Sequence, residues 1–105
     1  MNSQFGYKIR SLREQRKLYL RQVAPLLEMD TAQLSKIEKG LRQMKKEQIT
    51  IIADIYKTDK TELETLWLAD QIVEVVKDSN TALQAIYVAG NQIKDRKPIN
   101  RLSKK

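Results

Sequence analysis

The chain has 105 residues, with 20 Lys/Arg against 13 Asp/Glu, and it contains no His and no Cys. That length suffices for a single domain with a modest core. Without Cys there is no disulfide or thiol chemistry, and without His the commonest metal ligand and general base is missing. No apolar run reaches the roughly 18 residues of a membrane span. We therefore expect a soluble, cytoplasmic protein without metal or cofactor, and its formal charge of +7 favours a polyanionic partner.

The basic residues are unevenly distributed along the chain. Residues 1–60 carry 13 Lys/Arg against 7 Asp/Glu, whereas residues 61–96 carry 3 against 6. Residues 97–105 add four basic residues and no acidic one. A polyanion would therefore meet the first half of the chain, and we expect the last nine residues to form a basic flexible tail.

Apolar residues recur at helical spacing through most of the chain, so the predicted fold class is all-α. Ser3 can cap the first helix, and Asp59 with Glu62 resembles a capping box for the fifth. The predicted helices run from Ser3 to about Arg16, from Leu18 to Leu27, over Asp30–Gly40, from about Lys45 to Tyr56, from Asp59 to about Asp78, and from Thr81 to about Asp95.

The third of these segments, Asp30–Gly40, is short and capped at both ends. Asp30 is a suitable N-cap with Gln33 three residues later, and Gly40 supplies the C-terminal stop. Leu34 and Ile37 can point inward, which leaves an outer face that is small, polar and basic. Such a face suits a DNA major groove. A solvated surface helix would show the same local pattern, so the neighbouring segments decide between the two interpretations.

The second segment ends about three residues before the third begins, which is the spacing of a helix-turn-helix. Around Leu34-Ser-Lys-Ile-Glu-Lys-Gly40, with Val23-Ala24 upstream and Ile49 and Leu63 downstream, the chain resembles the phage-repressor/Cro (Xre) type of helix-turn-helix domain. The resemblance covers about residues 5–67. It implies a compact five-helix fold, here extended by a C-terminal helix, that binds double-stranded DNA and usually controls transcription.

By position, the resemblance places Thr31, Ala32 and Lys36 at base-facing sites. Lys36 has the best chemical basis for specificity, because its ammonium can meet guanine O6 and N7. Thr31 could instead reinforce the helix start, Ala32 could be a spacer, and Lys36 could contact only phosphate. Residues expected beside them or on the sugar-phosphate backbone are Arg21, Gln22, Gln33, Ser35, Lys39, Arg42, Lys45 and Lys46.

Glu38 matches the internal acid of the family, which pairs with an arginine of the first helix, here Arg13. Such a pair would tie the first helix to the recognition helix. The chain departs from the family pattern in the second helix and its turn. Tyr19-Leu20 replaces the usual Ser/Thr-Gln, Glu28 occupies a turn position that is often Gly, and Pro25 is expected to kink the second helix. Met44 stands where Pro is frequent.

The organisation expected from these observations is a DNA-binding domain at residues 1–67, a helical extension at 68–96 and the tail at 97–105. The extension carries apolar residues on several sides and is a candidate homodimer seam, which a two-fold operator would require. Alternatively, it completes the core of the monomer.

The expected function is that of a homodimeric, sequence-specific transcriptional regulator, either a bacterial or phage-type repressor or the controller of a restriction-modification operon. The alternative is the antitoxin of a toxin–antitoxin pair, which would bind DNA with its first half and a toxin with its C-terminal helices. RNA binding is disfavoured because the layout of the recognition helix fits a B-form major groove, whereas RNA-binding proteins usually offer aromatic stacking surfaces. Only six aromatic residues occur, and Phe5, Tyr56 and Trp67 are expected in the core. No catalytic residues are expected, because no poised carboxylate pair is visible.

Overall fold

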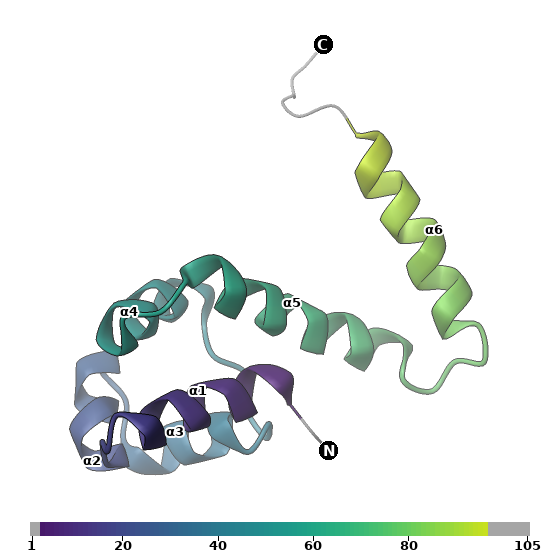
Figure 1. The fold of residues 1–105 in the computed structure, drawn as a ribbon. Coiled ribbons are helices and arrows are strands. Elements are labelled where there is room, and N and C mark those ends of the chain that lie inside the picture. Colours follow the sequence, from purple (N-terminus) through teal and green to yellow (C-terminus); the bar gives the residue numbers. More distant parts are fainter. Residues whose placement is uncertain (1–2, 97–105) are drawn as a thin grey trace. The chain divides into compact units, whose positions relative to one another are not determined.

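The structure, a computed structural model, describes residues 3–96, and the predicted basic tail at 97–105 lies outside them. The described residues form helices and no strand, which confirms the predicted all-α fold class. The elements are α1 (Gln4–Gln15), α2 (Leu20–Val23), the 3-10 helix η1 (Ala24–Leu27), α3 (Thr31–Glu38), α4 (Lys46–Tyr56), α5 (Lys60–Val76) and α6 (Ala82–Asp95), shown in Figure 1.

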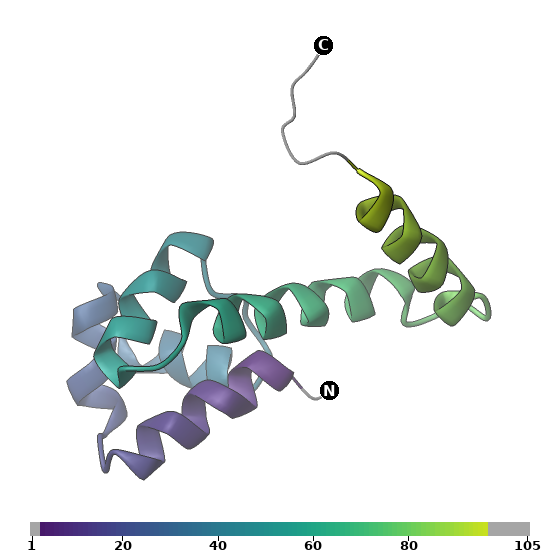
Figure 2. The same cartoon turned by 45° about the horizontal axis from the view of Figure 1, so that its top comes forward.

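Helix α1 begins where the sequence predicts a cap. The Ser3 hydroxyl accepts a hydrogen bond from the Gly6 amide at 2.8 Å, satisfying one of the free N–H groups of the first turn. The predicted inward residues Phe5, Ile9 and Leu12 are buried. This helix lies beside α3 in Figures 1 and 2.

The second helix is shorter than predicted. Leu18 lies outside it, and the α-helical part begins at Leu20, after Tyr19 in an extended conformation. Pro25 does not kink a continuous α-helix as expected; the chain changes to the 3-10 helix η1, with the proline in its first turn. This position suits a residue that lacks a backbone donor. The segment ends at Leu27, so three residues precede α3, the predicted turn length.

Helix α3 has the predicted cap at each end. The Asp30 carboxylate accepts from the Gln33 amide at 2.8 Å. At the other end Gly40 adopts a positive φ of 79°, its amide bonds to the Ile37 carbonyl, and the Leu41 amide bonds to the Lys36 carbonyl at 2.8 Å. These two bonds form a Schellman motif, which explains why the helix ends there.

The core lies in the part of the chain from α1 to α5. Leu34 and Ile37 on α3 are buried, as are the four residues predicted for α4, which are Ile49, Ile52, Ala53 and Tyr56. Leu63 is the buried residue of α5, and partly buried Trp67 packs against the same cluster. A single hydrophobic cluster thus fixes how α3 is presented.

The structure divides into two compact units, one ending at Val73 and the other beginning at Glu74. Helix α6 in the second unit contains no buried residue. Its large apolar side chains are exposed; they are Leu83, Ile86, Tyr87, Val88 and Ile93. Over residues 3–96, none of the helices combines the length and apolar character needed to cross a membrane.

Candidate nucleic-acid interface

The outer face of α3 is exposed to solvent at the three positions expected to face bases. Thr31, Ala32 and Lys36 are exposed, while Leu34 and Ile37 on the opposite side are buried. Thr31 and Ala32 belong to the first turn, and Lys36 lies four to five residues later on the same face. The face is uncharged at Thr31 and Ala32 and cationic at Lys36. Because Thr31 and Ala32 are small, the first turn of α3 leaves room for a DNA groove to come close to the helix backbone.

The flanking residues of α3 differ in exposure. Gln33 and Ser35 are half-buried, and Lys39, at the C-terminal cap, is exposed. The structure therefore leaves Lys39 free to reach an anion. Less of Gln33 and Ser35 is available to a ligand.

The segment after α3 presents further basic side chains. Arg42, Lys45 and Lys46 are exposed, but Lys46 also lies 3.7 Å from the Glu64 carboxylate on α5. Because both side chains of that pair reach solvent, the pair is weak. Arg42 and Lys45 therefore provide the less neutralised charges of this segment, which we name the basic loop (residues 39–45).

Gln48 holds the end of the basic loop, and its role was not predicted from the sequence. Its Oε1 accepts from the Lys45 amide at 3.1 Å, and its Nε2 donates to the Leu27 carbonyl at 3.1 Å. The side chain thereby connects the start of α4 to the end of η1. Its position three residues after Lys45 is that of a capping glutamine, which is the sequence signal that could have revealed it.

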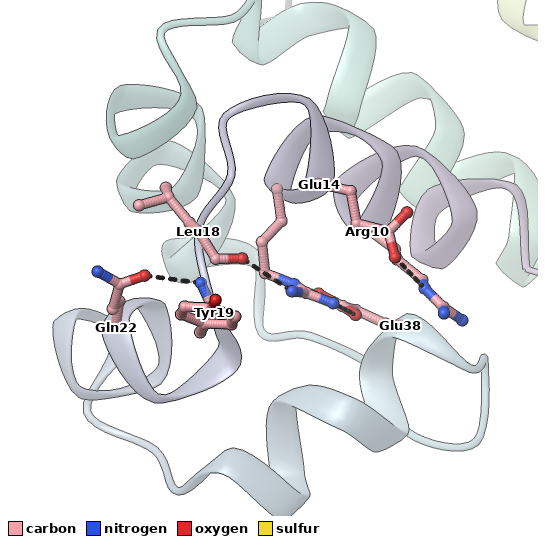
Figure 3. A network of polar contacts seen from close by, with 7 residues as sticks. Arg10, Glu14, Leu18, Tyr19, Gln22 and Glu38 are labelled. Atoms are coloured by element: carbon pink, nitrogen blue, oxygen red, sulfur yellow. Dashed lines mark hydrogen bonds and ion pairs between the residues drawn. The ribbon is translucent and has the colours of Figure 1, made fainter.

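Gln22 and Arg21, expected on the DNA backbone, are both exposed on α2. Gln22 Oε1 accepts from the Tyr19 amide at 2.7 Å (Figure 3), and the Arg21 guanidinium lies 4.4 Å from the centre of the Tyr19 ring. Gln22 thus satisfies the Tyr19 amide from the third position of α2, which is one half of a capping box, while the Tyr19 side chain makes no cap hydrogen bond. Its amide nitrogen is left to donate outward.

Arg13 and Glu38 form a bidentate ion pair between α1 and α3. Arg13 Nε lies 2.8 Å from one Glu38 carboxylate oxygen, and Nη2 lies 3.0 Å from the other. Arg13 also donates to the Leu18 carbonyl at 2.9 Å, so it holds the segment between α1 and α2 as well; Figure 3 shows Glu38 and Leu18 in this network. The hydrogen bond to Glu38 raises the pKa of Arg13, and the guanidinium stays charged.

Gly6 marks a close backbone approach between the same two helices. A Cβ on this residue would lie 2.6 Å from both the Ile37 and the Glu38 carbonyl oxygens. Only a residue without a side chain fits against the last turn of α3. Sequence reasoning did not identify Gly6, because a glycine within a helical pattern gives no sign of what faces it.

The described part of the chain holds no group of three or more His, Cys, Asp or Glu residues placed to bind a metal ion. What it does bring together is a short capped helix with an exposed face, a basic loop next to it, and a buried ion pair that ties this helix to α1.

Comparison with known proteins agrees with this geometry. The family model described as a helix-turn-helix domain matches residues 4–66, which is more than half of the chain. No curated protein and no solved structure matches the chain. The matched residues include α1 to α4 and the first part of α5, and the match confirms the helix-turn-helix domain that the motif around Gly40 indicated. The chain therefore belongs to the helix-turn-helix domain family of DNA-binding proteins, consistent with the Xre type.

Proposed function

We propose that this protein is a sequence-specific transcriptional regulator that binds double-stranded DNA in the cytoplasm, with α3 lying in the major groove. The observation that carries the proposal is the exposed face of Thr31, Ala32 and Lys36 on a helix whose opposite side is buried. Lys36 reads a guanine edge, and Thr31 contributes its hydroxyl or its methyl group. Ala32 lets the backbone approach.

The phosphate contacts belong to the elements on either side of α3. Arg42, Lys45 and Lys46 bind the backbone beyond its C-terminal end, with Lys39 beside them. Arg21 and Gln22 bind it from α2. Such contacts set orientation and affinity without reading sequence, and they make binding dependent on salt. Gln33 and Ser35 lie next to the base-facing residues and contact the nearest sugar-phosphate.

The regulator acts as a homodimer on a two-fold operator, as a phage-type repressor or a restriction-modification controller would. Residues 68–96 supply the dimer contacts. Helix α6 supports this assignment because its large apolar side chains are exposed and a helix of 14 residues has little stability of its own in water. A two-fold operator requires a second copy of α3 on the same face of the duplex.

The same exposed helix also supports a second candidate function. A toxin could cover the apolar side of α6, and the acidic excess of residues 61–96 would suit a basic partner. The protein would then be an antitoxin that binds its operon with its first half. Co-expression with basic proteins encoded beside it, followed by purification, separates the candidates, because a self-sufficient homodimer needs no second chain.

Selection of bound sequences from random duplex DNA, at stated salt, tests the leading proposal. We expect the intact protein to enrich a two-fold motif and Lys36→Ala to lose the preference at one position of each half-site. Lys60→Ala removes the same charge from an exposed position on α5 and should leave the motif unchanged. If the intact protein enriches no motif, the proposal is wrong.

A further inference from the structure

Helix α5 continues past the matched domain, and two of its residues bond to distant segments, one to the basic loop and the other to the start of α1. Trp67 Nε1 donates to the Met44 carbonyl at 2.7 Å. Asp70, one turn further along, accepts three hydrogen bonds from the start of α1. Both residues lie beyond position 66, where the family match ends.

Asp70 acts as a cap supplied from a distant part of the chain. One carboxylate oxygen accepts from the Ser3 hydroxyl at 2.7 Å and from the Phe5 amide at 3.1 Å, and the other accepts from the Gln4 amide at 3.0 Å. A carboxylate is favourable there because the first-turn amides are free and the helix dipole is positive at that end. Since Ser3 binds the Gly6 amide, Ser3 and Asp70 together satisfy three amides of the first turn.

The start of α1 in turn supports the last turn of α3. Gly6 lies against the Ile37 and Glu38 carbonyls so closely that a methyl group would not fit. A displacement of the α1 start therefore moves or releases the C-terminal end of α3. Since packed elements shift as discrete bodies, the angle at which α3 enters a groove depends on this contact.

Trp67 supports a different part of the interface. Its partner Met44 is buried, and the Met44 carbonyl belongs to the basic loop, between Arg42 and Lys45. Losing the indole hydrogen bond would loosen the middle of the loop that carries those two cations, while Gln48 still holds its end. The recognition helix, which is held by α1, would keep its place.

We propose that Asp70 and Trp67 are positioning residues for DNA binding with separate roles. Asp70 sets the angle of α3 through α1, and Trp67 holds the basic loop against the phosphates. This inference rests on the proposed function.

The test compares three full-length variants. Asp70→Asn removes the charge and one acceptor of the cap, and Trp67→Phe keeps an aromatic ring but removes the donor. Glu74→Gln is the matched control, since Glu74 lies on the same helix and its carboxylate makes only an exposed contact of 2.7 Å with Lys77, just past the helix end. Binding is measured well below the unfolding temperature, to a selected duplex and to an unrelated one, over a range of salt.

The two variants should weaken DNA binding in different ways. Asp70→Asn should lower the ratio of specific to nonspecific affinity by roughly three- to tenfold and leave the salt slope unchanged. Trp67→Phe should weaken both duplexes equally and reduce the salt slope by about one unit. The control should match the parent protein. The proposal is overturned if both variants weaken the two duplexes alike, or if they lower only the unfolding temperature.

Hydrogen exchange without DNA separates this inference from the proposed function. Asp70→Asn should speed exchange of the Lys39, Gly40 and Leu41 amides, which close the end of α3, and Glu74→Gln should not. Unchanged exchange would refute the positioning role even if the protein binds DNA. If the Asp70→Asn variant exchanges faster but the intact protein selects no duplex, the proposed function is wrong, whereas the support of α3 by Asp70 through α1 stands.

Discussion

Gly6 and Glu38 meet backbone to backbone, since a Cβ on Gly6 would lie 2.6 Å from the Glu38 carbonyl oxygen. We expect Gly6→Ala to destabilise the fold by about 1–3 kcal/mol, because overpacking outweighs the usual helical gain of alanine over glycine. Chemical denaturation measures the change. Gly90→Ala is the matched control, because nothing lies within 4 Å of a Cβ built there, and it should stabilise α6. Equal effects at the two positions would contradict the close approach.

Removal of one partner of the Arg13–Glu38 pair should strongly lower the free energy of unfolding. Both side chains are largely shielded, with exposed fractions of 11% for Arg13 and 4% for Glu38. Arg13→Ala should cost about 3–5 kcal/mol of unfolding free energy because it strands a buried carboxylate. DNA binding should weaken with it, since one of the contacts by which α1 positions α3 is lost. Arg10→Ala on the same helix breaks only the surface pair with Glu14 and should cost less than about 1 kcal/mol.

A double variant separates the charge from the packing in this pair. Arg13→Met with Glu38→Leu replaces both groups by apolar side chains and should recover most of the stability lost in Arg13→Ala. Denaturant midpoints compare the three proteins. If the double variant is as unstable as the single one, shape rather than stranded charge explains the loss.

Glu28, in the turn between η1 and α3, adopts a left-handed backbone conformation with φ 56° and ψ 43°. Glu28→Gly should stabilise the domain by about 1 kcal/mol, because glycine adopts this conformation without the steric cost of a Cβ. Glu28→Ala removes the same charge and keeps the Cβ. Thermal unfolding of both variants measures the change in stability. If Glu28→Ala gains as much stability as Glu28→Gly, the effect comes from the lost charge and not from the backbone conformation.

The Tyr56 hydroxyl is buried and has no hydrogen-bond partner in the described structure. Burial, with Glu38 as a second contribution, raises the pKa of this phenol, so it remains neutral at ordinary pH. Tyr56→Phe should therefore leave stability unchanged or raise it by up to about 1 kcal/mol, because no bond is lost. A clear loss in a urea titration would show that the hydroxyl is satisfied in solution.

The apolar side of α6 should carry the proposed dimer contact. Ile86 and Ile93 are seven residues apart on one face, and both are exposed. Ile86→Glu with Ile93→Glu should convert the protein to a monomer in sedimentation or light-scattering measurements and weaken binding to a two-fold site. Gln84→Glu on the opposite side should leave the dimer intact. A double variant that stays dimeric would exclude α6 from the interface.

By itself, the sequence determined the all-α class, the caps of α1 and α3, and most of the core. Periodicity reveals Leu34, Ile37 and Ile49 as buried, because a helix shows one stripe to the core. Asp30 and Gly40 act within a few residues of themselves, so their roles are visible locally. The motif ending at Gly40 was sufficient to indicate the helix-turn-helix domain.

The tertiary structure alone decided the contacts between residues far apart in the chain. Asp70 reaches Ser3 across 67 positions, and no local pattern reveals which helix start a surface carboxylate will cap. The constraint on Gly6 likewise comes from the facing carbonyls of α3. The change to a 3-10 helix at Pro25, in a segment where Val23, Ala24 and Leu27 are buried, was also seen only in the structure. Such pairings depend on chain topology, because the same local propensities are compatible with many packings.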